Sequence, residues 1–211
     1  MRPSPPPVPH HKRTGRPRSA DADRAILEAT REALVELGFG GLTLGDVAAR
    51  AGVAKTTLYR RWPGKNELVV DAVAALFEER LELPDLGSLR ADIQGVVLRF
   101  AELLNMPETR TALMAVVAEA TSDEPLRRRI RDAIVDRQKH LVLLGRMRAQ
   151  ERGELPPDDG TEDPGRDDMI FDVVAGSVVH RVMVSSEPVD EEWADRLALL
   201  LVAGIGGLHA A

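Results

Sequence analysis

Residues 55–62, with the sequence KTTLYRRW, combine side chains that suit two different surroundings. Lysine, threonine, tyrosine and arginine can donate hydrogen bonds to phosphate oxygens and base edges, so they suit a wet, negatively charged surface. Leu58 and Trp62 are four residues apart and would share one face of a helix. We therefore expect a helix that buries one face in a small core and presents its cations and hydroxyls to a polyanion.

The charge of the chain is divided between its two parts. Residues 1–65 carry 12 Lys and Arg against 6 Asp and Glu, whereas residues 66–211 carry 16 against 28. A basic front on an acidic body is expected of a protein that meets a polyanion with one end only. A chance partition of surface charge is the alternative explanation.

The composition argues against several other classes of protein. The chain of 211 residues has no cysteine, which excludes disulfides and thiolate metal sites. Its five histidines are too scattered for a metal site, and no set of nucleophile, base and oxyanion donors is evident. The longest apolar run, residues 197–208, contains three glycines and is too short to cross a bilayer. We predict a cytoplasmic protein that is not an enzyme and needs no metal or cofactor.

Hydrophobic spacing typical of helices runs through most of the chain and predicts an all-α fold of about nine helices. Thr43, followed by Asp46, is expected to cap the second helix, while Gly38 and Gly52 end the first two. Residues 1–18, rich in proline and cations, are expected to form a flexible basic arm. The expected helices cover residues 21–37, 43–51, 54–62, 65–83, 89–104, 107–121, 125–152, 167–185 and 191–209.

Only two residues separate the second and third expected helices, which is typical of a helix-turn-helix. In that motif the second helix enters the major groove of DNA, with its N-terminal residues at base edges. The predicted contacts are Lys55, Thr56 and Thr57 to bases, and Tyr59, Arg60, Arg61 and Lys65 to phosphates. A helical protein-interaction module whose basic face binds an acidic partner is the alternative.

Residues 38–73, GFGGLTLGDVAARAGVAKTTLYRRWPGKNELVVDAV, resemble the DNA-binding domain of the TetR family of bacterial transcriptional regulators. The shared features are the glycine-aromatic pair after the first helix, the pattern T-hydrophobic-x-x-V-A-x-x-A-G-V through the turn, T-L-Y with an aromatic residue three positions on, and K-x-x-L. The resemblance implies a DNA-binding domain over residues 19–65. It assigns DNA contacts to Thr43, Lys55, Thr56, Thr57, Tyr59, Arg60 and Lys65.

Two positions depart from the family pattern. The residue after A-G-V is often a serine that caps the recognition helix, whereas here it is Ala54. Loss of a cap costs about 1 kcal/mol, which Thr56 or Thr57 could recover with a hydroxyl. Trp62 stands where the family commonly has phenylalanine, so the same core position holds a larger residue.

The basic arm contains HHKRTGRPR, a Gly-Arg-Pro core flanked by cations, which resembles minor-groove-binding hooks. Arg16 and Arg18, with Arg13, could enter a narrow A·T-rich minor groove beside the recognition helix. A tail that contributes only non-specific charge is the alternative.

For residues 66–211 the family resemblance implies a helical domain that binds a small-molecule effector and dimerises. Residues 176–205 are similar to the C-terminal region of one TetR subgroup, and their small and apolar residues suit close helix packing. An intramolecular helix pair is the alternative. The expected dimer interface comprises Gly176, Val178, Val182, Leu197, Leu200, Leu201 and Gly204. The expected pocket lining comprises Phe77, Phe100, Leu103, Met106, Leu113, Met114, Val117 and Ile134, although each residue suits an ordinary core equally.

These observations predict a ligand-responsive repressor that binds a palindromic operator in double-stranded DNA as a homodimer, with an unidentified effector and no membrane partner. A ligand would favour a spacing of the two DNA-binding units that no longer matches the half-sites. The sign of the response, repression, activation or co-repression, stays open.

Overall fold

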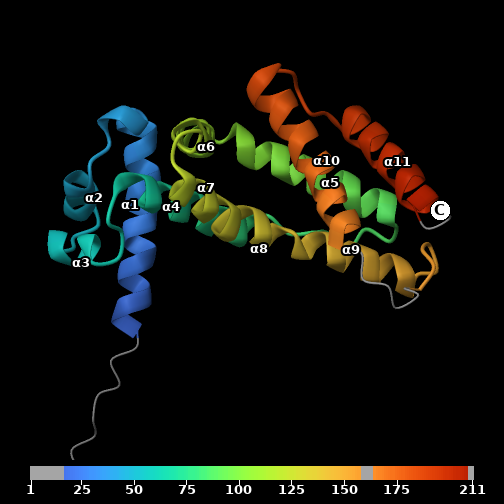
Figure 1. The fold of residues 1–211 in the computed structure, drawn as a ribbon, viewed down its shortest axis with the longest axis horizontal. Coiled ribbons are helices and arrows are strands. Elements are labelled where there is room, and N and C mark those ends of the chain that lie inside the picture. The colour runs from blue at the N-terminus through green and yellow to red at the C-terminus, as the bar shows by residue number, and fades with distance from the viewer. Residues whose placement is uncertain (1–16, 158–163, 209–211) are drawn as a thin grey trace, which may run out of the picture.

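The computed structural model describes residues 17–157 and 164–208, and within them every regular element is helical (Figure 1). Counting helices that follow one another in one stretch as one, the described residues form nine helices, which confirms the predicted all-α fold. None of these helices is both long and apolar enough to cross a membrane. The elements are α1 (Pro17–Gly41), α2 (Leu44–Arg50), α3 (Lys55–Tyr59), α4 (Lys65–Arg80), α5 (Leu89–Asn105), α6 (Pro107–Glu119), α7 (Glu124–Ile130), η1 (Arg131–Val135), α8 (Asp136–Gln138), α9 (His140–Glu151), α10 (Pro164–Val179), η2 (His180–Val184) and α11 (Glu191–Leu208).

Capping residues and glycines set the first helix boundaries. The Thr43 hydroxyl accepts a hydrogen bond from the Asp46 N–H at 3.2 Å and donates one to the Asp46 carboxylate at 2.6 Å, so it caps α2. Gly38 and Gly52 have φ of 67° and 65°, a left-handed conformation that glycine adopts without strain; Gly38 kinks α1 before its last turn, and Gly52 follows the end of α2. Since these signals are local in the sequence, they could be read before any tertiary contact was known.

Two expected helices are interrupted by π-helical segments. Residues 125–152 divide into α7, η1, α8 and α9, and residues 167–185 divide into α10 and η2. The N–H of Asp136 bonds to the carbonyl of Arg131, and the N–H of Ser185 to that of His180, so each bond spans five residues. Such a segment inserts an extra residue into a turn and changes the direction of the side chains that follow it. Apolar spacing gave no sign of either interruption.

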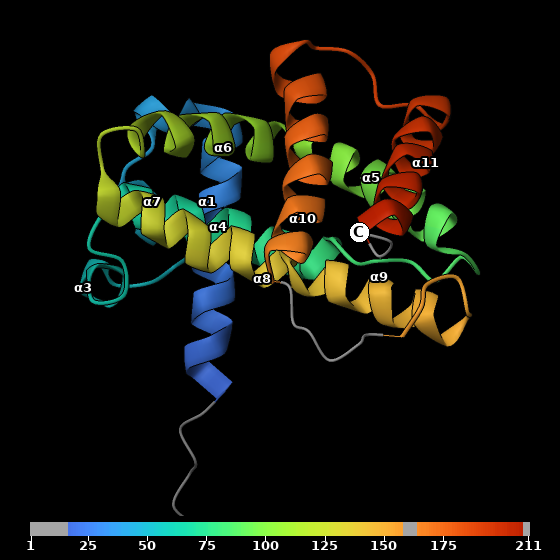
Figure 2. The same ribbon diagram turned by 45° about the vertical axis from the view of Figure 1, so that its right-hand side comes forward.

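Helix α4 joins the two parts of the molecule. It packs on α1, α6, α7 and η1, and α6 also contacts α1, while α11 lies along α5 at the far end of the body (Figures 1 and 2). Its apolar side chains are buried from Leu68 to Phe77. A helix that is apolar around most of its circumference needs partners on every side, so α4 belongs to the core of both parts.

Candidate functional site

Helix α3 is fixed by two side chains and exposes most of the others. Leu58 is completely buried and Trp62 is 5% exposed, packed against Val47 and Ala48 of α2 in one core. Lys55, Thr56, Tyr59 and Arg60 are exposed, and Thr57, Arg61 and Lys65 are partly exposed. The surface that remains free therefore consists of the cations and hydroxyls expected to face DNA.

The first turn of α3 begins without a side-chain cap. Ala54 occupies the N-cap position and its side chain makes no capping hydrogen bond, although its carbonyl accepts from the Thr57 N–H at 2.9 Å. The Lys55 ammonium lies over α2, where a Cβ at Gly45 would come within 3.3 Å of its Nζ. The N–H groups of Lys55 and Thr56, the first two of α3, are thus left for water or for an anion outside the subunit.

Two cations near the end of the motif already have partners within the subunit. Arg61 forms an ion pair with Asp23 of α1. Lys65 donates a hydrogen bond to the Phe39 carbonyl at 2.9 Å, and its Nζ lies 4.3 Å from the centre of the Phe39 ring. Both side chains therefore hold α3 and α4 against α1, and their predicted phosphate contacts stay predictions.

A further ion pair ties α2 to α1. Arg50 donates to Glu36 at 2.6 Å, and this hydrogen bond together with the positive charge lowers the pKa of Glu36 and raises that of Arg50. Because both groups are solvent-exposed, the pair serves mainly to orient the two helices.

The three arginines predicted to enter the minor groove are placed differently. Arg13 and Arg16 lie outside the described residues, whereas Arg18 belongs to α1. The helix therefore begins at Pro17, within the segment predicted to be a flexible arm. The role of all three arginines in DNA binding stays a prediction.

Hydrogen bonds to one carboxylate, that of Asp71, connect the helix-turn-helix to the body. Trp62 donates its indole N–H to Asp71 of α4 at 2.8 Å, and Arg129 of α7 donates to the same carboxylate at 2.7 and 3.2 Å. Asp71 thus bonds at once to the residue that anchors α3 and to a helix of the body. Sequence reasoning placed Trp62 in a core but did not find its hydrogen-bond partner.

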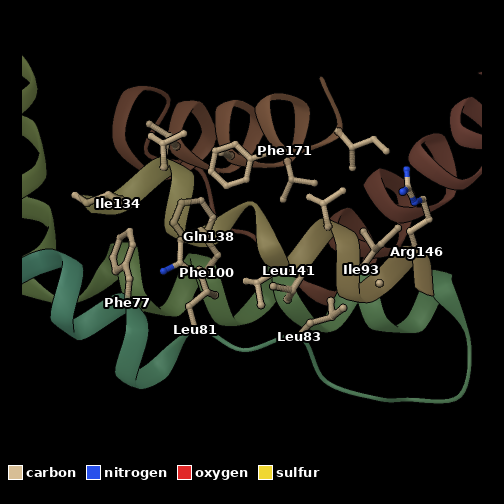
Figure 3. Close-up of a pocket in the computed structure, with 18 of the residues that line it drawn as sticks. Phe77, Leu81, Leu83, Ile93, Phe100, Ile134, Gln138, Leu141, Arg146 and Phe171 are labelled. Atoms are coloured by element: carbon tan, nitrogen blue, oxygen red, sulfur yellow. The ribbon is translucent and has the colours of Figure 1, made fainter. Parts of the chain in front are cut away.

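The body encloses an apolar cavity of about 320 Å³, whose lining comes from every helix from α4 to α11 (Figure 3). This volume lies at the lower end of the range of small-molecule sites. Phe77 and Phe100 meet edge to face at its wall, with ring centres 5.9 Å apart. The described polar residues of the lining are Gln138, Arg146 and Arg166, and Arg146 pairs with Asp167 at 3.1 Å.

The cavity is lined by some of the expected residues and by many others. Phe77, Phe100, Leu113, Met114, Val117 and Ile134 border it. Leu103 and Met106 do not, so the prediction is wrong for these two. Leu103 is buried in the helical core, and Met106 joins α5 to α6 with its sulfur 3.9 Å from Arg80. Residues that the sequence reasoning missed include Leu81, Leu83, Ile93, Gln138, Leu141, Arg146 and Phe171.

The expected dimer residues also divide into two groups. Gly176, Leu200 and Gly204 are exposed. Val178, Val182, Leu197 and Leu201 are at most 8% exposed, because helices of the same subunit cover them. The prediction that these four side chains face a partner is corrected accordingly. The apolar side chains exposed instead on these helices are Met169, Val173, Val184 and Leu199.

The described residues contain no group of histidine, aspartate and glutamate that could hold a metal ion. The structure thus has a short helix with a polar exposed face, α3, an apolar cavity in the body, and one helix, α4, that contacts both regions. These features define a helix-turn-helix DNA-binding protein with a separate helical body.

Comparison with known proteins identifies the family. A family model described as bacterial regulatory proteins, tetR family, matches residues 26–72, and one described as tetracyclin repressor-like, C-terminal domain, matches residues 83–201. The chain therefore belongs to the TetR family of bacterial transcriptional regulators, which are not enzymes. Proteins of this family bind DNA operators, dimerise and bind small-molecule effectors.

Individual relatives agree with this assignment. The DNA-binding transcriptional repressor TetR of Mycobacteroides abscessus is 30% identical over 179 residues, covering 82% of this chain and 87% of that one. The HTH-type transcriptional regulator YdeS of Bacillus subtilis is 26% identical over 197 residues, or 93% and 96% of the two chains. The solved structure of the TetR family regulator SCO0332 matches with a TM-score of 0.72 at 30% identity, covering 87% of this chain and 98% of its own.

We expect Ala54→Ser to supply the missing cap of α3. A serine at the N-cap accepts a hydrogen bond from the first turn and should raise the free energy of unfolding by about 1 kcal/mol in urea titrations. Ala49→Ser, inside α2 and exposed, is the matched control and should not stabilise the protein. A lack of stabilisation by Ala54→Ser would mean that the α3 N-terminus is already satisfied.

Arg60→Ala should weaken DNA binding and reduce the slope of log K against log salt concentration by about one, since it removes one phosphate contact. The control is Arg128→Ala on α7, an exposed cation outside the motif. Binding of both variants is measured by fluorescence anisotropy at several salt concentrations. Equal effects of the two substitutions would indicate non-specific charge attraction in place of a defined contact.

Proposed function

We propose that this protein is a ligand-responsive repressor that binds a palindromic operator as a homodimer and leaves it when a ligand fills the cavity. The observation that carries the proposal is the course of α4. Its first residue, Lys65, bonds to Phe39 of the DNA-binding unit, and Phe77, near its other end, borders the cavity. A single helix thus has one end in each of the two sites.

Repression is favoured over activation by a relative. The Mycobacteroides abscessus protein, 30% identical over most of both chains, carries the name of a DNA-binding transcriptional repressor. The exposed polar face of α3 supports a DNA contact in the major groove, and the ligand acts by removing the protein from that groove.

Dimerisation is supported by the outer surface of α10 and α11. Leu200 is 72% exposed and Leu199 51% exposed, and Val173 on α10 is 42% exposed. Gly176 and Gly204 on the same helices carry no side chain and would allow a second pair of helices to approach closely. A two-fold dimer through this surface presents two α3 helices to half-sites about 34 Å apart.

Release follows from the position of α4. A ligand packed against Phe77 shifts the cavity end of the helix, and the Asp71 carboxylate carries the shift to Trp62 and thereby to α3. The two α3 helices of the dimer then no longer match the spacing of the half-sites, so the affinity for the operator falls.

Selection of bound sequences from random DNA with the purified protein tests the DNA and dimer parts together. We expect an inverted repeat to be enriched. Leu200→Glu places a charge in the proposed interface and should convert the dimer to a monomer in sedimentation experiments, with a loss of operator affinity of at least tenfold. Val35→Glu, on the exposed side of α1, is the control and should remain dimeric. Failure to enrich any repeat, or a dimer that survives Leu200→Glu, would contradict the proposal.

Asp71→Asn tests the coupling. Asparagine can still accept the Trp62 hydrogen bond but loses the charge that pairs with Arg129. We expect ligand affinity to stay the same while the ligand-induced drop in operator affinity becomes about fivefold smaller. Glu78→Gln is the matched control, because Glu78 lies on α4 and pairs with Arg137. Equal loss of coupling in both variants would show that α4 acts without the Asp71 link.

A further inference from the structure

Gln138 is the feature of the cavity that packing does not explain. It is the last residue of α8 and its side chain is 4% exposed. Its Oε1 atom is buried without a hydrogen-bond partner among the described residues. A buried carbonyl oxygen without a hydrogen-bond donor is costly, and an apolar residue of similar volume would fill the same space more favourably.

The neighbours of Gln138 on the same wall are apolar. Ile134, four residues earlier, and Leu141 and Val142, three and four residues later, line the cavity with it. Gln138 is therefore the one polar residue in this stripe of apolar side chains, which share one side of the helix. The π-helical segment η1, Arg131–Val135, ends just before α8 and helps to set the direction of this stripe.

The other polar residues of the lining are remote from Gln138. Arg146 is eight residues further along the chain, roughly 12 Å at the rise of a helix. Figure 3 places Gln138 toward the Phe77 end of the cavity and Arg146 at the opposite end. Arg146 and Arg166 both lie near Asp167, at 3.1 and 4.0 Å. The Gln138 amide is therefore the one polar group among the described lining residues at the Phe77 end of the cavity.

The surroundings of the amide restrict what can bind there. The described lining at this end, Phe77, Phe100 and Ile134, offers no charge to neutralise an ionised ligand group. A buried charge without a counterion is strongly unfavourable, whereas a neutral hydroxyl both donates and accepts and can satisfy an amide.

We propose that the cavity takes a neutral, largely aliphatic ligand whose hydroxyl or similar hydrogen-bonding group is recognised by Gln138. This inference rests on the proposed function, because it assigns a chemical class to the ligand of the same cavity. The remainder of the ligand lies along the apolar wall toward Arg146.

The test compares three probes of equal chain length, 1-decanol, 1-chlorodecane and decanoate, by isothermal titration calorimetry with the full chain. We expect the wild type to bind 1-decanol about five- to tenfold more tightly than 1-chlorodecane, the worth of one buried hydrogen bond, and decanoate more weakly than 1-decanol. Gln138→Leu should bind the alcohol and the chloride equally well. Without ligand, Gln138→Leu should unfold at a temperature no lower than the wild type, which separates recognition from misfolding.

Gln150→Leu is the matched control, since Gln150 lies on α9 outside the cavity and donates to the Pro156 carbonyl. It should keep the wild-type preference for the alcohol. Tightest binding of decanoate, no preference between alcohol and chloride in the wild type, an unchanged preference in Gln138→Leu, or binding of none of the three probes would overturn the proposal.

Operator release is measured with the same protein and probes to separate this inference from the proposed function. Alcohol binding that depends on Gln138 but leaves the operator complex intact would support the ligand class and contradict the repressor mechanism. Release by decanoate that is insensitive to Gln138→Leu would support the mechanism and contradict the ligand class.

Discussion

The structure depends on the burial of α4 on nearly all sides. Leu68, Val69 and Val73 lie in the same continuous core as Ile26 of the DNA-binding unit and Phe100 of the body. A close-packed core cannot absorb the movement of a central helix without loss of contacts. This shared core is the physical basis of the proposed coupling, because a movement of α4 at the cavity would disturb its contacts with the DNA-binding unit.

Helix α3, unlike α4, is buried on one face only, and it is too short to be stable alone. A helix of five residues gains too few hydrogen bonds to offset its nucleation cost, and Ala54 gives it no cap. Its position comes from Leu58 and Trp62, and the Trp62 indole is in turn held by Asp71. The surface proposed to contact DNA is thus positioned by contacts on the opposite face of the same helix.

The cavity also depends on tertiary packing, and its apolar lining contains the buried amide of Gln138. Its walls come from segments as distant in the chain as Phe77 and Ile205, so its shape exists only when the body is assembled. The Oε1 atom of Gln138 has no hydrogen-bond partner in the empty body, and the proposed ligand would supply one. A cavity that leaves a buried oxygen unpaired when empty suits a regulator that responds to a ligand, because binding then favours the arrangement of helices that pairs this oxygen.

The sequence alone determined the helical class and the DNA-binding motif, since both depend on signals between near neighbours: the Thr43 cap, the turn at Gly52, and the four-residue spacing of Leu58 and Trp62. It did not determine which apolar residues meet one another. Val178, Val182, Leu197 and Leu201 have the pattern of an interface, yet their own subunit covers them, and Leu103 and Met106 lie outside the cavity. Only the tertiary structure decided these cases, because an apolar residue in a sequence favours burial but carries no information on which surface will bury it.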